Sequence, residues 1–188
     1  PNERAATGPG DRVARGKGGT LMDLDIEIDG WPGTHDWAEL AYRAAEAAEK
    51  VAPELANRRL TASVLFTVDE DVRRLNREWR TKDKPTNVLS FPMLLRDELT
   101  GLAPEGGPEM LGDLALAWET CRREAAEKGI ATEDHTAHLL VHGFLHLAGY
   151  DHEISDRDAD AMEALEIKAL AILGLPDPYG DRDNQEHA

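Results

Sequence analysis

An apolar helix that ends in an abrupt reversal is predicted between Thr132 and His152, and it restricts the fold more than any other segment. Residues 132–148 are mainly apolar and compatible with a helix, and Gly149 directly follows them. Glycine takes the left-handed conformation that ends helices without the steric penalty of a side chain. The chain is therefore expected to turn back at this glycine and to bring His152 beside the end of a buried helix.

The histidines at this helix end are spaced to share one metal ion. His142 and His146 are four residues apart, so their side chains lie one turn above each other on one helix face. After the reversal at Gly149, His152 can approach the same point. Three imidazole ligands leave the fourth tetrahedral position open, as in catalytic zinc sites. The spacing predicts one Zn2+ per chain held by His142, His146 and His152, although nickel, copper or iron also accept imidazole ligands.

Other interpretations of the histidines are weaker. If the three histidines were ordinary interior or surface residues, no glycine would be needed at the turn between them. The presence of Gly149 at that turn therefore favours the metal site. His138, His142 and His146 form a straight stripe, but about 12 Å of helical rise separates its ends, too far for one ion. His138 is therefore expected beside the site rather than among the ligands. Metzincin peptidases carry a glutamate general base directly after the first histidine, where this chain has Gly143.

Charge limits how the chain could contact nucleic acid. Its formal net charge is −16, so its average field repels phosphate. The stretch 58–84 is an exception, with eight basic and five acidic residues. Arg80 lies near its end, and a guanidinium can grip a phosphate with two parallel hydrogen bonds. A surface salt bridge at Arg80 and a solvated helix face over the whole stretch are the simpler alternatives.

The composition is that of one globular domain with a proper core, since 188 residues contain 41% hydrophobic residues. The single cysteine, Cys121, excludes an intrachain disulfide and fits a reducing compartment. No apolar run approaches the roughly 20 residues of a membrane span. We expect the domain at 22–175, a polar tail at 176–188, and at 1–21 an extension that is either disordered or a cloning remnant.

Alternation and turn residues divide this domain into four strands and about five helices. The strands are expected at 24–28, 61–68, 88–91 and 111–118. The helices are expected at 36–51, at 69–79, up to Lys128, at 132–148 and after a cap at Ser155. Residues 93–110 are rich in glycine and proline and are expected to form a loop. This mixture predicts an α+β fold, with a four-stranded mixed sheet packed against about five helices.

Three blocks of the chain match a known pattern in the right order: Leu75–Arg80 with Pro85–Pro92, then Leu111–Leu114, then His142–His152. Together they resemble the YbeY family, bacterial endoribonucleases of ribosomal RNA maturation. The resemblance covers about residues 24–173. Two departures are visible: Asn87 stands where aspartate is commoner, and the segment 93–110 is long.

The resemblance implies a zinc-dependent endoribonuclease of single-stranded RNA, acting in 16S rRNA 3′-end maturation and ribosome quality control. It implies the metal site at the three histidines and a functional arginine at Arg80, and we expect His142 to take part in catalysis as well. It also implies work in the cytoplasm on ribosomal RNA, with small-subunit ribosomal proteins and the GTPase Era as partners, by a protein expected to be monomeric. Further candidates for substrate contacts are Arg77, Thr86, Ser90 and His138.

Two other functions stay open. A ribosome-assembly factor with a mainly structural metal would fit the acidic charge, and a metallopeptidase is less favoured because Gly143 replaces the general base. The reaction chemistry is open as well, since either water or the RNA 2′-hydroxyl could attack the phosphorus. A 2′,3′-cyclic phosphate end would indicate the hydroxyl, and a 5′-phosphate end would indicate water.

Overall fold

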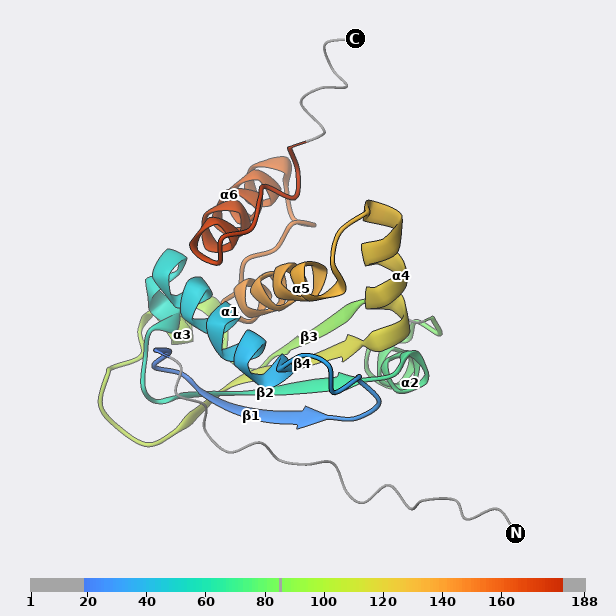
Figure 1. The fold of residues 1–188 in the computed structure, drawn as a ribbon. Coiled ribbons are helices and arrows are strands. Elements are labelled where there is room, and N and C mark those ends of the chain that lie inside the picture. Colours follow the sequence, from blue (N-terminus) through green and yellow to red (C-terminus); the bar gives the residue numbers. More distant parts are fainter. Residues whose placement is uncertain (1–18, 85, 181–188) are drawn as a thin grey trace.

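The computed structural model describes residues 19–84 and 86–180, and a four-stranded mixed sheet forms its centre (Figure 1). In spatial order the strands are β1 (Asp23–Ile28), β2 (Leu60–Thr67), β4 (Glu109–Ala117) and β3 (Val88–Pro92). The pairs β1–β2 and β2–β4 are parallel, whereas β3 runs antiparallel to β4 at one edge. The predicted α+β fold with a four-stranded mixed sheet is confirmed.

Within the described residues the sheet is accompanied by α1 (Trp37–Val51), α2 (Asp69–Arg80), α3 (Arg96–Thr100), α4 (Trp118–Lys128), α5 (Thr132–Leu147), α6 (Asp156–Ile172) and a 3-10 turn (Pro53–Leu55). In Figure 1, α1 and α5 lie over one side of the sheet, and α6 lies above them. None of these helices has the length and apolar character needed to cross a membrane.

The two faces of the sheet are covered by different helices. In β4, Leu114 and Leu116 belong to the large core that also includes α1 and α5, whereas Ala115 and Ala117 pack with Val72 of α2. The alternation arises because successive side chains of a strand point to opposite faces. Helix α5 therefore packs on one face of the sheet and α2 on the other. Strand β3 forms the edge of the sheet between these two helices.

Helix α5 is enclosed between the sheet and the helices α1, α4 and α6. Its side chains Leu140, Phe144 and Leu145 are fully buried, and each such burial stabilises the fold by about 1.5–3 kcal/mol. The helix approaches β4 so closely that a Cβ at Gly143 would lie 2.8 Å from a methyl carbon of Leu114. This packing fixes the position of the helix that carries the first two candidate ligands.

Residues 19–21 are anchored to α1, although the prediction placed them in an N-terminal extension. The Thr20 hydroxyl donates to the carboxylate of Glu49 at 2.5 Å, and the backbone amides of Leu21 and Met22 donate to it at 3.1 Å and 2.9 Å. Glu49 is only 6% exposed. These contacts show that residues 20 and 21, expected to be part of an extension, are packed against the domain; residues 1–18 lie outside the described residues.

Deleting residues 1–21 is expected to destabilise the protein more than deleting residues 1–18. The longer deletion removes Thr20 and Leu21, two of the residues that donate to the buried Glu49 carboxylate. The Met22 nitrogen remains as a donor, but a buried acceptor that loses most of its donors is destabilised by about 1–3 kcal/mol. Urea unfolding of the two truncated chains measures the difference. Equal free energies of unfolding would show that these contacts contribute nothing to stability.

The segment 93–110 contains α3, which the prediction of a plain loop missed because five residues make little more than one helical turn. Arg59, directly before β2, donates to two backbone carbonyls of the segment. Arg96 of α3 donates to the carbonyl of Ala148 at 2.8 Å and lies 4.4 Å from the ring centroid of Tyr150. The segment therefore supports the C-terminal end of α5.

Candidate metal centre

The end of α5 reverses the chain, which confirms the predicted role of Gly149. This residue has a φ of 91°, in the left-handed region. The amides of Gly149 and Tyr150 donate to carbonyls in the last turn of α5, a pairing typical of helix C-termini. A Cβ at position 149 would also lie 3.0 Å from the Cβ of Arg96. The reversal returns the following segment, with His152, towards the helix.

Three histidines meet at this reversal. One ring nitrogen from each of His142, His146 and His152 lies within 4.8 Å of the other two. The Nε2 atoms of His142 and His146 are 2.8 Å apart, and the His152 ring centroid lies 5.4 Å and 5.2 Å from theirs. In the described part of the chain no other group of three His, Cys, Asp or Glu side chains is close enough to share a metal ion.

The two helical histidines are oriented by hydrogen bonds from Nδ1, the ring nitrogen that faces away from the other histidines. Nδ1 of His142 donates to Oε1 of Glu166, and Nδ1 of His146 donates to the carbonyl of Tyr150 at 2.9 Å. With the proton held on Nδ1, each Nε2 keeps a free lone pair, as metal-binding histidines require. Burial, together with the neighbouring His142 and His152, lowers the pKa of His146 to about 4, so its ring is neutral at neutral pH. This donor set fits a tetrahedral ion such as Zn2+ with one position left over.

Glu166 is a residue behind the candidate metal centre that the sequence interpretation missed. It lies in α6, whose predicted cap at Ser155 is confirmed, and it is 1% exposed. Burial disfavours its charged form, but hydrogen bonds from His138, His142 and Tyr179 outweigh burial and hold the pKa of Glu166 well below its usual range. The available signal was a carboxylate on an apolar helix face, four residues after buried Met162.

Arg80 and the histidines line one cleft of about 530 Å³. Nη2 of Arg80 donates to the carbonyl of Ser90 at 2.5 Å, and its guanidinium lies 5.6 Å from the centroid of the Phe91 ring. The predicted contact residues Thr86 and Ser90 belong to the same wall. The whole lining consists of Arg80, Thr86, Asn87, Val88, Ser90, Pro92, His142, His146, Gly149, Tyr150, Asp151, His152 and Glu153.

Two predicted contact residues do not line this cleft. Arg77 lies one turn before Arg80 and faces the carboxylate of Asp83 at 3.8 Å, so the structure does not bring it to the histidines. His138 lies behind the site, where its Nε2 is 3.3 Å from the hydroxyl of Tyr179 and 3.8 Å from a carboxylate oxygen of Glu166. It therefore contacts the group that orients His142, as expected for a neighbour of the ligands rather than a ligand.

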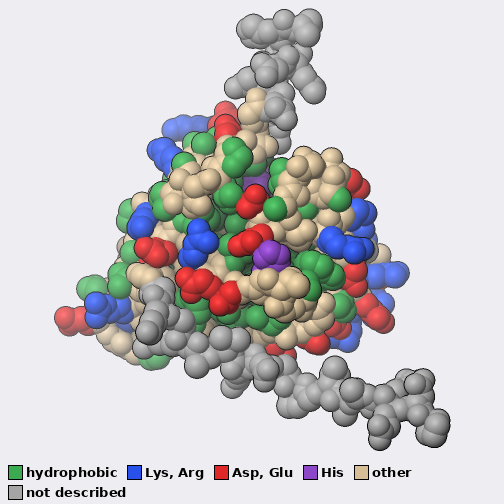
Figure 2. All heavy atoms as spheres, viewed as in Figure 1, with side chains coloured by type: hydrophobic (Ala, Val, Ile, Leu, Met, Phe, Trp, Pro, Cys, Tyr) green, Lys and Arg blue, Asp and Glu red, His purple; other side chains and the backbone are tan. Residues whose placement is uncertain are grey.

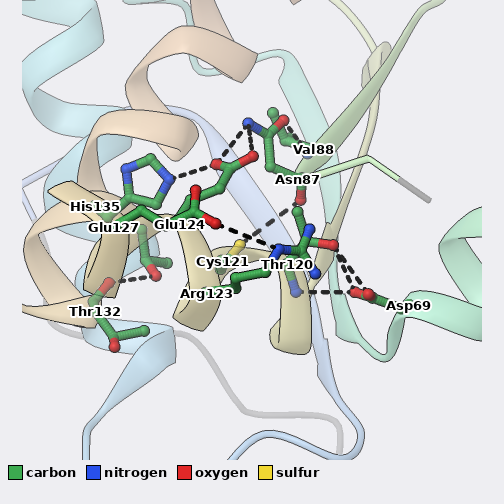
Figure 3. A network of polar contacts seen from close by, with 11 residues as sticks. Asp69, Asn87, Val88, Thr120, Cys121, Arg123, Glu124, Glu127, Thr132 and His135 are labelled. Carbon is green, nitrogen blue, oxygen red and sulfur yellow. Dashed lines mark hydrogen bonds and ion pairs between the residues drawn. The ribbon is translucent and has the colours of Figure 1, made fainter.

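A polar network joins the wall of the cleft to α4 and α5 (Figure 3). Nδ2 of Asn87 donates to Oε2 of Glu124 at 3.0 Å, and Nε2 of His135 donates to the same oxygen at 2.7 Å. Aspartate at position 87 would face Glu124 with a second negative charge, so the amide is the matching group in this chain. The thiol of Cys121 donates to the carbonyl of Asn87 at 3.7 Å, and burial raises its pKa.

The ring of His135 is held neutral in this network. Burial lowers its pKa, and the opposing hydrogen bond to Glu124 does not cancel that effect. Its Nδ1 is buried and has no hydrogen-bond partner among the described residues, which is less costly for a lone pair than for an N–H group. The proton is therefore placed on Nε2, where Glu124 accepts it.

The arginines of α2 differ in their partners. Arg73 pairs with Asp83 at 2.8 Å and Arg74 pairs with Asp71 at 3.0 Å, whereas no carboxylate within the described residues lies in ion-pair distance of Arg80. Acidic, basic and apolar side chains are interspersed over the face shown in Figure 2, with no continuous basic field there. Of the arginines of α2, Arg80 alone lines the cleft.

Replacing Gly149 with alanine is expected to weaken both the fold and the metal centre. The positive φ and the contact with Arg96 oppose a side chain at this position, with a cost of about 1 kcal/mol or more. Displacement of His152 should also lower metal affinity. Gly129→Ala is the matched control, because Gly129 has a φ of 67° and a Cβ added there would have no neighbour within 4 Å. Equal losses of metal in both variants would contradict a specific role of the reversal.

Comparison with known proteins shows the family. A family model described as Endoribonuclease YbeY matches residues 29–174. Endoribonuclease YbeY of Erythrobacter litoralis is 64% identical over 161 residues, which cover 86% of this chain and 99% of that protein. The protein of the same name from Novosphingobium aromaticivorans is 57% identical over 164 residues, covering 87% and 98%.

A solved structure supports the fold independently. The solution structure of a Thermotoga maritima protein matches with a TM-score of 0.52 and 22% identity, over 89% of this chain and 95% of that chain. The three ordered blocks that resemble YbeY lie inside the segment that the family model matches, and that segment includes all three histidines. The chain belongs to the YbeY family.

Proposed function

We propose that this protein is a zinc-dependent endoribonuclease that cleaves single-stranded RNA in the cleft between β3 and the C-terminal end of α5. The proposal is carried by one observation: Arg80, which has no carboxylate partner among the described residues, lines the same cleft as the three histidines. Relatives that align over nearly their full length bear the name Endoribonuclease YbeY, which supports RNA as the substrate.

Arg80 is the group proposed to bind the scissile phosphate. One of its N–H donors is used by the Ser90 carbonyl, which orients the guanidinium at the edge strand. The remaining donors of the five are available for phosphate oxygens. Thr86 and Ser90 line the same wall, and their hydroxyl groups are proposed to add hydrogen bonds. Stabilisation of charge that develops on phosphate is the expected catalytic contribution of Arg80.

The histidines are proposed to hold the metal through their Nε2 atoms. When bound, the ion would polarise a phosphate oxygen and lower the pKa of water near it. Glu166 and the Tyr150 carbonyl keep the protons of His142 and His146 on Nδ1, so both rings present the correct tautomer. The proposed part of His142 in the reaction, like that of His146, is to hold the ion.

Single-stranded RNA fits this site better than a duplex. A cleft of about 530 Å³ admits a short stretch of backbone with splayed bases, whereas a paired A-form helix presents its backbone on a wide, stiff surface. The net charge of −16 opposes tight binding to RNA in general. We therefore propose that specificity for the substrate comes from small-subunit ribosomal proteins and the GTPase Era. The proposed role is maturation of the 16S rRNA 3′ end and ribosome quality control in the cytoplasm, and the enzyme is proposed to act as a monomer.

The peptidase alternative is opposed by Gly143. Its position faces β4 inside the core, where any side chain would collide with Leu114. A glutamate general base therefore cannot be provided from the place that metzincins use. The assembly-factor alternative differs from the proposal in requiring no cleavage at all.

The test offers the purified protein single-stranded RNA, duplex RNA and casein, each with and without a chelator. Chelator-sensitive cleavage of the single strand alone is the expected result, and the chemistry of the product ends then identifies the attacking group. Casein cleavage would replace the proposal with a peptidase. Absence of cleavage even in assembling ribosomal particles would replace it with an assembly factor.

A further inference from the structure

The segment after α6 folds back onto the metal centre. Helix α6 is followed by Gly174, whose φ of 77° lies in the left-handed region, and the amides of Gly174 and Leu175 donate to carbonyls of the last turn. Asp177 then accepts the backbone amide of Tyr179 at 2.7 Å in a tight turn. The prediction placed these residues in a polar tail, 176–188, but 176–180 are part of the fold; 181–188 lie outside the described residues.

This turn places the hydroxyl of Tyr179 within hydrogen-bond distance of the Glu166 carboxylate. The hydroxyl donates to Oε2 of Glu166, while Oε1 of the same carboxylate accepts from Nδ1 of His142. The Tyr179 oxygen also lies 3.3 Å from Nε2 of His138, which can donate to it. Each oxygen of the buried carboxylate is thus held from a different side, and the chain of contacts ends at a candidate metal ligand.

We infer that Tyr179 is a positioning residue of the metal centre, which fixes the carboxylate of Glu166 and, through it, the orientation of the His142 ring. The inference rests on the metal site of the proposed function. A phenylalanine at 179 would leave Oε2 of Glu166 buried and short of a donor, because this carboxylate is 1% exposed and water cannot replace the hydroxyl freely. The carboxylate would then turn towards other donors, and its grip on His142 would loosen.

The expected consequence is weaker metal binding. Loss of a group that orients a metal-binding histidine lowers affinity by about 10- to 100-fold. Tyr179 acts one step further from the ion than Glu166, so Tyr179→Phe is expected near the lower limit and Glu166→Gln above it. Both variants keep approximately the size of the original side chain. Neither Tyr179 nor Glu166 lines the cleft, so the proposed phosphate-binding side chains of Arg80, Thr86 and Ser90 stay in place.

The test measures Zn2+ affinity of the full-length protein by competition with a chromophoric chelator, and the visible absorption of bound Co2+ as a report of ligand geometry. Tyr179→Phe should weaken Zn2+ binding about tenfold and change the Co2+ spectrum. Tyr42→Phe is the matched control, since the Tyr42 hydroxyl donates to the Leu24 carbonyl at 3.4 Å, in the core between α1 and β1. It should bind both metals like the parent.

Melting temperatures of the metal-free variants separate positioning from folding. If Tyr179→Phe melts lower, Asp177→Ala provides the second variant, because it loosens the turn and keeps the hydroxyl; it should shift affinity in the same direction by a smaller factor. Zn2+ affinity within twofold of the parent in a folded Tyr179→Phe protein would overturn the inference. Because metal binding is measured without RNA, failure of RNA cleavage in the parent would reject the proposed function and leave this inference standing.

Discussion

Replacing His146 with alanine is expected to remove stoichiometric zinc from the protein. His142 and His146 present their Nε2 atoms 2.8 Å apart towards the same point, and the variant leaves two imidazoles, one of them on the exposed segment after the reversal. Two nitrogen ligands bind zinc far more weakly than three in a preformed site. Elemental analysis of the purified variant, compared with the parent at about one zinc per chain, gives the result directly.

Two histidine controls define the ligand set. His138→Ala should keep most of the metal, because His138 contacts Tyr179 and Glu166 rather than the site itself. His35→Ala should keep all of it, because His35 is a surface residue that pairs with Glu133 at 3.1 Å. Full zinc in the His146 variant, or complete loss in the His138 variant, would show that the ligands have been assigned wrongly.

Replacing Arg80 with alanine is expected to lower RNA cleavage by about 100-fold while zinc content and melting temperature stay near those of the parent. The side chain is exposed at the helix end and contacts the Ser90 carbonyl and the Phe91 ring, so the fold depends little on it. Single-turnover cleavage of a labelled single strand at saturating metal measures the effect on the chemical step.

Lysine should restore little of this activity, because an ammonium group cannot reproduce the two parallel hydrogen bonds of a guanidinium. Arg74→Ala is the matched control on the same helix, since Arg74 is paired with Asp71 outside the cleft. Cleavage by Arg80→Ala within a few-fold of Arg74→Ala would reassign Arg80 to an ordinary surface role.

The local parts of the fold and site could be predicted from the sequence. Helix and strand positions follow from periodicity and caps, so the helix expected at 36–51 is found at Trp37–Val51. The three histidines come from one continuous segment, and the conformation of Gly149 largely determines whether they meet. A prediction that depends only on neighbouring residues in this way needs no knowledge of the tertiary packing.

The remaining parts depend on contacts between distant segments. Glu166 lies in α6, the helix after the one that carries His142, and Tyr179 lies in the turn that follows α6. Nothing in their local sequence shows that α6 packs so that the Glu166 carboxylate contacts the His142 ring. The sequence around Thr20 resembles a flexible N-terminal segment, and only the tertiary fold brings the Glu49 carboxylate of α1 within hydrogen-bond distance of the Thr20 hydroxyl. In each case the donors to a buried carboxylate come from segments that only the tertiary fold brings close to it. Patterns in a single sequence do not reveal such contacts.

Metal titration of the metal-free protein, with RNA cleavage and zinc occupancy followed in the same samples, tests the central claim most directly. The claim is that one ion, held by His142, His146 and His152, serves one RNA-cleaving cleft. Cleavage of single-stranded RNA should rise in proportion to occupancy and reach its maximum at one equivalent of zinc per chain. Cleavage that is already complete in the metal-free protein, or that does not follow the occupancy of this site, would contradict the account.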